Sequence, residues 1–471
     1  MIAHRDIQGN ILRGHTRHLH AAYLLTRIED PGRARSLLRR LADEDRIATE
    51  RDWGQLPQTR LNVAFTHPGL RRLEVDEAPF TRYPDFCEGM RARARSHLGD
   101  LGANDPDGWD PALQDEIHLL VTVLGLTAEV RDAAAGALTG ELGAAGITVV
   151  HDQRADMLTS GREHFGFRDG FSQPAIQGMS EDRRSRRGEG VQRRRLRLTG
   201  EEWRNVKPGE FVLGYEDEDG VVPGGRDPYL VNGTFMVWRK LEQHVDAFNR
   251  WLAAQAGDDV AAQDLLRAKI LGRWPDGDSL VRRPEPGPYG DPPVDTGDGA
   301  AGTGERGPDA ERRHDLEIND FTYAADLGGV RCPLGAHVRR SNPRDALGFR
   351  TERSRRNRII RRGLPYIERD QDSQRESRGL IFVCFNASIA RQFEQIQGNW
   401  LMSGDTFGLG EERDFLTAGL DPGQPSVRMT IQGDRGRPPS FISRTQQFVT
   451  VRGGHYLFVP GLRALRKIAG S

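Results

Sequence analysis

The first half of the chain alternates short apolar segments with amphipathic ones. Four segments have the length and apolar patterning of β-strands: 21–28, 60–66, 116–125 and 146–153. Two segments between them are predicted to be helical, at 32–43, where Ala34, Leu37, Leu38 and Leu41 share one face, and at 128–142, which is rich in alanine. This βαββαβ order predicts a ferredoxin-like unit, with an antiparallel sheet and its helices on one face.

The second half repeats this rhythm. Strands are predicted at 209–215, 234–241 and 379–386, and helices at 241–252 and 389–396. The segment 446–465 is predicted to close the chain as a hairpin followed by a helix. The fold class is therefore α+β with two ferredoxin-like domains, which we place at 1–205 and 206–471. The two halves share no evident sequence identity, so a duplication is inferred from element order alone.

Two segments interrupt the pattern. Residues 181–198 are strongly basic, and residues 274–315 are dense in Pro, Gly and Asp. The second segment is predicted to be a long surface loop inserted in the C-terminal domain. The basic segment could touch a polyanion, but its interspersed Glu and Gly favour a solvated loop.

Composition limits the function classes further. The chain has 471 residues and a net charge of −1, so it offers no general attraction to nucleic acid or anionic lipid. Its three cysteines, Cys87, Cys332 and Cys384, form no CxxC pair, which argues against a disulfide framework or a structural zinc site. No apolar run reaches ~18 residues, and the N-terminal residues lack a signal-peptide core, so we expect a cytoplasmic protein with no membrane partner.

The segment HFGFRDGFSQP at 164–174 places Asp169 among glycines and aromatic residues. Asp-Gly is a common turn dipeptide, so the pair alone indicates only a turn. The flanking phenylalanines would withdraw the carboxylate from water and raise its pKa, which suits a group that carries a proton.

A second cluster, CPLGAHVRRSNPRD at 332–345, contains His337. A lone histidine is more often a core residue than a ligand, but here several arginines follow it. Such a histidine could bind iron while the cations meet the two propionates of a haem. A third segment, NRIIRRGLPY at 357–366, contains Arg361, which by itself would be read as a surface residue.

Together these segments resemble the dye-decolorizing peroxidase family. The similarity rests on the G-x-x-D-G motif with its HFGF and SQP flanks, on AHVRRSNPR and on IIRRGLPY. It extends through DIQGNILRGH, FVLGY, NGTFMVWRKLEQHVDAF and GLIFVCFNASIARQFEQIQGNW, and so covers nearly the whole chain. The insertion at 274–315 resembles that of the larger subgroup. The family fold has two ferredoxin-like domains in a dimeric α+β barrel-like arrangement, with haem b in the C-terminal domain.

The resemblance implies a role for each matching residue. His337 would be the axial ligand of the haem iron, Asp169 the distal acid–base and Arg361 the distal arginine. Further haem contacts would come from Gly170, Phe171, Ser172, Asn342, Pro343 and Arg344, and Arg339 would face a propionate. The acidic residue that orients the axial histidine is not identifiable from the sequence, so the redox character of His337 stays open.

The implied activity is a haem peroxidase that forms a ferryl intermediate with hydrogen peroxide and oxidises an organic reductant by one-electron steps. Because Asp169 must be ionised to accept a proton, we expect activity biased to acidic pH. Bulky substrates would need a surface radical, for which Trp400, Tyr456 and Trp238 are candidates, although core packing is the better interpretation of each. A homo-oligomer is possible.

Four alternatives stay open at this point. The scaffold could serve a biosynthetic oxidase or oxygenase acting on one small metabolite, or a haem-handling protein. The Arg-rich segment 183–197 could bind nucleic acid, but no aromatic platform accompanies it. Cys332 could supply a thiolate ligand, although its Cys-Pro-Leu-Gly context favours a buried turn.

Overall fold

A computed structural model describes residues 2–14, 17–51, 56–179, 205–285, 318–348, 352–369, 376–434 and 436–470. The basic segment 181–198 and residues 286–315 of the predicted insertion lie outside the described residues. Within the described part of the chain, no helix is long and apolar enough to cross a membrane.

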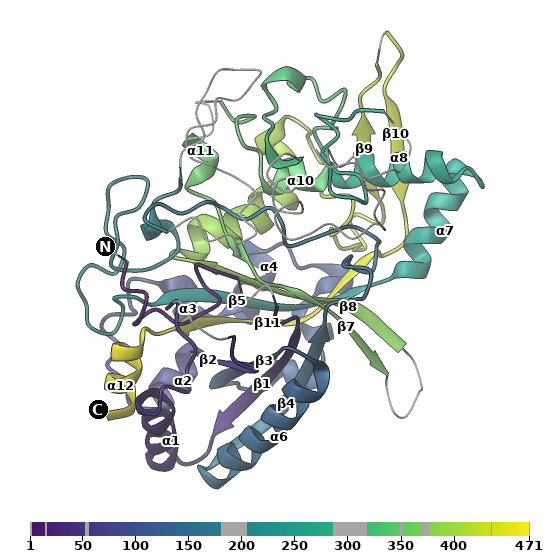
Figure 1. Cartoon of the computed structure of the whole chain (residues 1–471). Helices are drawn as coiled ribbons and strands as arrows, with labels where there is room; N and C mark the ends of the chain where they lie inside the picture. Colours follow the sequence, from purple (N-terminus) through teal and green to yellow (C-terminus); the bar gives the residue numbers. More distant parts are fainter. Residues whose placement is uncertain are drawn as a thin grey trace, which may run out of the picture.

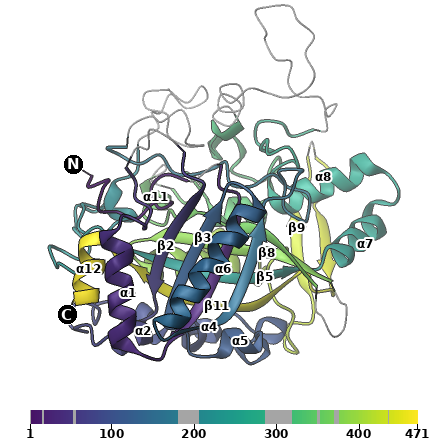
Figure 2. The ribbon, with the colours of Figure 1, turned by 60° about the horizontal axis from the view of Figure 1, so that its bottom comes forward.

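The N-terminal half forms the predicted ferredoxin-like unit. Its strands are β1 (His20–Ile28), β2 (Thr59–Phe65), β3 (Leu119–Gly125) and β4 (Ile147–Asp156). They pair antiparallel in the order β4-β1-β3-β2. Helices α1 (Pro31–Asp43) and α6 (Ala128–Ala144) cover one face of these strands (Figures 1 and 2). The predicted stripe of α1 is buried, since Ala34, Leu37, Leu38 and Leu41 are all at most 1% exposed.

The C-terminal half repeats the same strand order. Its strands are β5 (Thr234–Gln243), β6 (Ile360–Arg361), β7 (Leu364–Arg369), β8 (Glu376–Asn386) and β11 (Val449–Val459). They pair antiparallel as β11-β5-β8-β6, with β7 also beside β8. The helical segments associated with these strands are α7 (Val245–Ala256), α8 (Val260–Leu271) and the π-helix η5 (Ile389–Leu401). The α+β class with two ferredoxin-like units is confirmed.

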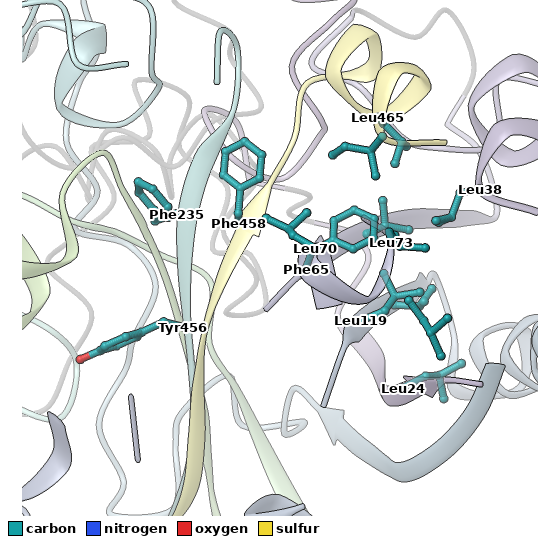
Figure 3. Packing of buried hydrophobic residues seen from close by; sticks show 14 of the residues in the cluster. Leu24, Leu38, Phe65, Leu70, Leu73, Leu119, Phe235, Tyr456, Phe458 and Leu465 are labelled. Atoms are coloured by element: carbon teal, nitrogen blue, oxygen red, sulfur yellow. The ribbon is translucent and has the colours of Figure 1, made fainter. Parts of the chain in front are cut away.

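The two units share one continuous sheet. Phe65 of β2 pairs with Phe458 of β11, so the full order is β4-β1-β3-β2-β11-β5-β8-β6. Apolar side chains from both units meet in one core at this junction (Figure 3). Helix α12 (Leu462–Gly470) follows β11 and packs against α1. The domain boundary at 205/206 separates the two sets of strands and stays a prediction.

Shorter elements connect and cover this framework. The helices are α2 (His67–Arg72), α3 (Pro84–Glu88), α4 (Met90–His97), α5 (Pro111–Gln114), α10 (His337–Ser341) and α11 (Glu352–Arg355). Single 3₁₀ turns occur at η1 (Gly102–Asn104), η2 (Pro106–Gly108), η3 (Pro208–Glu210), η4 (Ala324–Asp326) and η6 (Asp405–Phe407). Strands β9 (Val427–Ile431) and β10 (Ser440–Arg444) form a separate hairpin that projects from the molecule (Figure 1).

Three predictions about local structure are wrong. Residues 209–215 are not a strand, because the chain turns there through η3 and buries Phe211, Val212 and Leu213 together. The segment predicted as a C-terminal hairpin is the single strand β11. The residues that suggested a turn form a bulge between Val451 and Gly453. The start of the predicted surface loop at 274–285 is partly core, where Trp274, Leu280 and Val281 are at most 2% exposed.

Candidate active site

A cavity lies on one face of the C-terminal strands and brings the three predicted clusters together. Alternate residues of β5, β8 and β11 face it, including Leu241, Phe382 and Val451, as the two-residue period of a strand requires. Its walls also contain Asp169, His337 and Arg361. Other apolar residues of the wall are Phe171, Leu271, Phe393, Ile396, Leu401 and Leu416. The cavity is therefore mainly apolar, with a few polar groups at separate places.

Asp169 and Arg361 form an ion pair in this cavity. One terminal nitrogen of the Arg361 guanidinium donates to Asp169 Oδ1 at 2.7 Å. The side chains are 36% and 34% exposed, so both groups stay accessible from the cavity. The backbone N–H of Arg361 also donates to Gln173 Oε1 at 3.0 Å, which ties β6 to the segment that carries Asp169.

The loop around Asp169 is anchored by the half-buried carboxylate of Glu163. Glu163 accepts hydrogen bonds from the backbone N–H groups of Phe165 and Phe167, and from the side chain of Gln243 on β5. Both phenylalanines are buried. Gly170 has φ of +82°, a conformation that suits glycine and turns the chain directly after Asp169. Asp169 is thus presented to the cavity by a loop fixed on both sides.

The environment of Asp169 lowers its pKa. Burial acts to raise it, but the Arg361 cation, the backbone N–H of Gly170 and the hydrogen bond from Arg361 act in the opposite sense and prevail. The expectation that the aromatic flanks raise this pKa is therefore wrong, because the cation that compensates the charge comes from 192 residues further along the chain. Asp169 is a carboxylate, ready to accept a proton.

His337 begins helix α10 and faces the same cavity. Its Nδ1 lies 3.0 Å from Oδ2 of Asp414, a residue that is 0% exposed. With Nδ1 hydrogen-bonded to Asp414, Nε2 is the ring nitrogen available to a metal. Asp414 is the orienting acid that the sequence did not reveal, and no local pattern marks it, since 77 residues separate it from His337.

Asp414 is held in its ionised form. Its Oδ1 accepts hydrogen bonds from the backbone N–H and the hydroxyl of Thr417, at 2.8 and 2.7 Å. Burial acts to raise its pKa, but the nearby His337, the charge of Arg340 and the Thr417 hydroxyl hold it well below its usual range. A carboxylate in this position fixes the orientation of the imidazole and makes it a stronger electron donor.

Only some of the other predicted haem contacts line the cavity. Phe171, Ser172 and Asn342 line it, and Gly170 lines a smaller cavity that shares Asp169 and Arg361 with the larger one. Pro343 and Arg344 are buried and lie outside the described lining of both. The side chain of Arg344 instead donates to the carbonyls of Asn319 and Phe321.

The prediction that Arg339 faces a propionate gains no support from the structure, because Arg339 is not among the residues that line the cavity. Arg339 is 1% exposed and donates to Asp326 and to the carbonyl of Cys332. Its guanidinium also stacks over Tyr323. The cations that do line the cavity, besides Arg361, are Arg168, Arg239, Arg273 and Arg358. Arg168 and Arg358 lie within the quoted segments 164–174 and 357–366 but carry no motif that marks them, whereas Arg239 and Arg273 lie outside the three clusters.

The structure does not favour the candidate thiolate ligand or the candidate surface radicals. Cys332 is fully buried, and burial raises the pKa of its thiol to about 12, so it is a poor thiolate ligand beside His337. Trp400, Tyr456 and Trp238 are at most 4% exposed, so none is a surface residue. Trp400 lines the cavity, whereas Tyr456 donates to the buried Glu394.

The residues of the cavity fit a haem. His337 offers one ring nitrogen, and Asp414 fixes the other as the hydrogen-bonding partner, which is the donor arrangement of a haem-ligating histidine. The apolar strand residues and η5 suit the flat face of a porphyrin. Arg168, Arg273 and Arg358 also line the cavity and are the cations from which its carboxylates would draw partners.

Comparison with known proteins agrees with this geometry. Residues 6–157 match the DyP dimeric alpha+beta barrel domain, and residues 311–410 match the C-terminal domain of Dyp-type peroxidases. The chain is 28% identical to a dye-decolorizing peroxidase of Mycetinis scorodonius, over 88% of this chain and 77% of the relative. It is also 28% identical to a multifunctional dye peroxidase of Amycolatopsis sp., over 98% of this chain and 95% of the relative.

A solved structure is similar along its whole length. The fungal DyP-type peroxidase from Auricularia auricula-judae superposes with a TM-score of 0.78 and 25% identity, covering 100% of both chains. The two domain matches together span more than half of the sequence, and the relatives extend over most of it. The chain therefore belongs to the dye-decolorizing peroxidase family and is a haem peroxidase.

Proposed function

We propose that this peroxidase binds haem b in the cavity between His337 and the Asp169–Arg361 pair, with hydrogen peroxide as oxidant and an organic molecule as reductant. One observation carries the assignment of roles: the cavity contains a histidine backed by a buried carboxylate and, separately, a carboxylate paired with an arginine. A protein that only carried haem would need the first pair and not the second.

The second pair suits the activation of hydrogen peroxide. Bound haem supplies the centre that takes part in the two-electron reduction of peroxide and in the one-electron oxidation of the reductant. Asp169 accepts a proton from one peroxide oxygen and returns it to the other, so that the leaving oxygen departs as water. Arg361 places a guanidinium group beside Asp169 and stabilises the negative charge that develops as the O–O bond breaks.

The first pair holds the cofactor. His337 would bind the iron through Nε2, and Asp414 would keep the Nδ1 proton in place. Arg168, Arg273 and Arg358 are candidates for the propionates, and Phe171, Ser172 and Asn342 for contacts with the porphyrin. A biosynthetic oxidase and a haem-handling protein are not favoured, because the relatives that span most of the chain are peroxidases. The three free cysteines support a reducing, cytoplasmic location.

Absorption spectroscopy tests these roles. The purified, haem-loaded protein is mixed with one equivalent of hydrogen peroxide, and the rate of the spectral change is recorded by stopped flow. Asp169→Asn should keep haem and react roughly 10²- to 10⁴-fold more slowly, because the proton acceptor is lost. Asp107→Asn, which makes the same substitution at a 74% exposed carboxylate, is the control and should match the wild type.

Two results would contradict the proposed roles of Asp169 and His337. If Asp169→Asn reacts with peroxide at the wild-type rate, Asp169 is not the proton carrier. His337→Ala tests the cofactor assignment separately and should lose or weaken haem binding. A His337→Ala protein that retains haem with an unchanged ferric spectrum would move the axial ligand to another residue.

A further inference from the structure

Helix α10 carries a second buried arginine, three residues after His337. Arg340 is 0% exposed and points to the segment that leads to Asp414. Its guanidinium donates to the carbonyls of Trp400 at 2.7 Å, Leu401 at 3.2 Å, Ser403 at 2.6 Å and Glu412 at 3.0 Å. Arginine suits this task because its planar head carries five donors in fixed directions.

These carbonyls lie at the two ends of the segment 400–412, which connects η5 to Asp414. Trp400 and Leu401 end η5, whose last carbonyls lack partners within the helix. Glu412 lies two residues before Asp414. The backbone N–H of Asp414 itself donates to the carbonyl of Leu401 at 2.7 Å, so Arg340 and Asp414 share one acceptor. Arg340 therefore joins the helix that carries His337 to both ends of the segment that positions Asp414.

We propose that Arg340 is a positioning residue for the axial histidine: it locks α10 to the segment 400–412 and so keeps Asp414 within hydrogen-bonding distance of His337. This inference rests on the proposed role of His337 as iron ligand. The described contacts include no ion pair between Asp414 and Arg340; apart from its charge, the arginine acts on Asp414 through the main chain. The strength of the His337–Asp414 bond then depends on a residue that is not itself part of the described cavity lining.

The neighbouring Arg339 provides a matched control. It lies on the same short helix and is 1% exposed, but its guanidinium binds Asp326 and the carbonyls of Cys332 and Asp326 instead. Loss of either arginine leaves buried carbonyls without a donor and should lower stability. Only the loss of Arg340 should change the His337–Asp414 bond.

The experiment compares Arg340→Gln, Arg339→Gln and wild type as haem-loaded proteins. The readouts are the iron–histidine stretching frequency of the ferrous protein by resonance Raman spectroscopy and the ferric/ferrous reduction potential. Arg340→Gln should shift the stretch to lower frequency and the potential to more positive values, because a displaced Asp414 withdraws less from the Nδ1 proton and leaves His337 a weaker donor. Arg339→Gln should leave both unchanged.

The direction of the shift in stretching frequency and reduction potential distinguishes a displacement of Asp414 from the mere loss of the Arg340 charge. Loss of the Arg340 charge alone would make Asp414 a stronger acceptor and would move both readouts in the opposite direction. A shift in that direction, or no shift in haem-loaded Arg340→Gln, overturns the proposal. Arg340→Lys is the second variant if Arg340→Gln does not fold; with three donors in place of five it should show a smaller shift in the expected direction. Failure of wild-type His337 to ligate iron would instead overturn the proposed function.

Discussion

Asp414 binds His337 with one carboxylate oxygen and Thr417 with the other. The first contact is 3.0 Å long and the second, to the hydroxyl, is 2.7 Å. Because Asp414 is completely buried, its charge is compensated by these partners and by the surrounding cations rather than by water. The donor strength of His337 is thus determined by a carboxylate that cannot move without losing several hydrogen bonds.

Asp414→Asn should weaken haem binding by roughly 10- to 100-fold, as substitutions behind metal-ligating histidines do. The amide can accept from Nδ1–H but carries no charge, so the reduction potential should also become more positive. Haem titration and potentiometry measure the two effects. Asp421→Asn, in a turn of the same loop, is the control and should change neither. Equal affinity and potential in Asp414→Asn and wild type would remove Asp414 from the cofactor site.

Arg361→Leu should retain haem but react with hydrogen peroxide about 10²-fold more slowly or worse, because one preorganised cation is lost from the distal side. Stopped-flow absorbance gives the rate. Arg356→Leu, which removes a half-exposed arginine paired with Asp219, is the control. A rate for Arg361→Leu within twofold of wild type would refute the proposed role.

The lowered pKa of Asp169 determines the acid limit of the reaction. A carboxylate with a lowered pKa stays ionised as the pH falls, so the peroxide reaction should persist into acid and decline only below the pH range in which an ordinary aspartate titrates. In Arg361→Leu the compensating cation is gone, burial dominates and the acid limb should move to higher pH. Pre-steady-state rates between pH 3 and 7 test both statements. An acid limb that lies at the same pH in the two proteins would show that another group titrates.

The junction of the two units should be sensitive to truncation of a single ring. Phe458 is 0% exposed and contacts Phe80 and Phe235 across the core. Phe458→Ala should cost about 3–5 kcal/mol of unfolding free energy, measured by denaturant titration. Phe441→Ala, at a phenylalanine that is 78% exposed on β10, should stay within about 0.5 kcal/mol of wild type. Similar losses in both variants would show that Phe458 does not anchor the junction.

The repeated strand order was predictable from the sequence because most strands are short apolar runs followed by amphipathic helices. The stretch around Phe211 was misread because its apolar residues are buried in a turn, where burial does not follow a period of two. The strand β11 was misread because Gly453 and Gly454 suggest a turn, whereas pairing with β5 holds the segment extended through a bulge.

The candidate site was predictable where its residues carry local motifs, as Asp169, His337 and Arg361 do. Asp414 was not, because its role depends on folding across 77 residues and its neighbours resemble an ordinary loop. The direction of the Asp169 pKa was mispredicted for the same reason: local aromatic residues indicate burial, but the distant Arg361 determines the balance. Motifs thus locate the reacting groups, while their electrostatics depend on long-range contacts.

The position of β11 has a consequence for the order of biosynthesis. The last strand of the chain lies in the middle of the sheet, between β2 and β5, and contributes Val449 and Val451 to the cavity wall. While the ribosome is still adding residues before Val449, the N-terminal unit can fold, but β5 has an open edge and the cavity lacks one side. This side of the cavity can close only after β11 has been synthesised and has paired with β5, so the site depends on strands that are far apart in the order of synthesis.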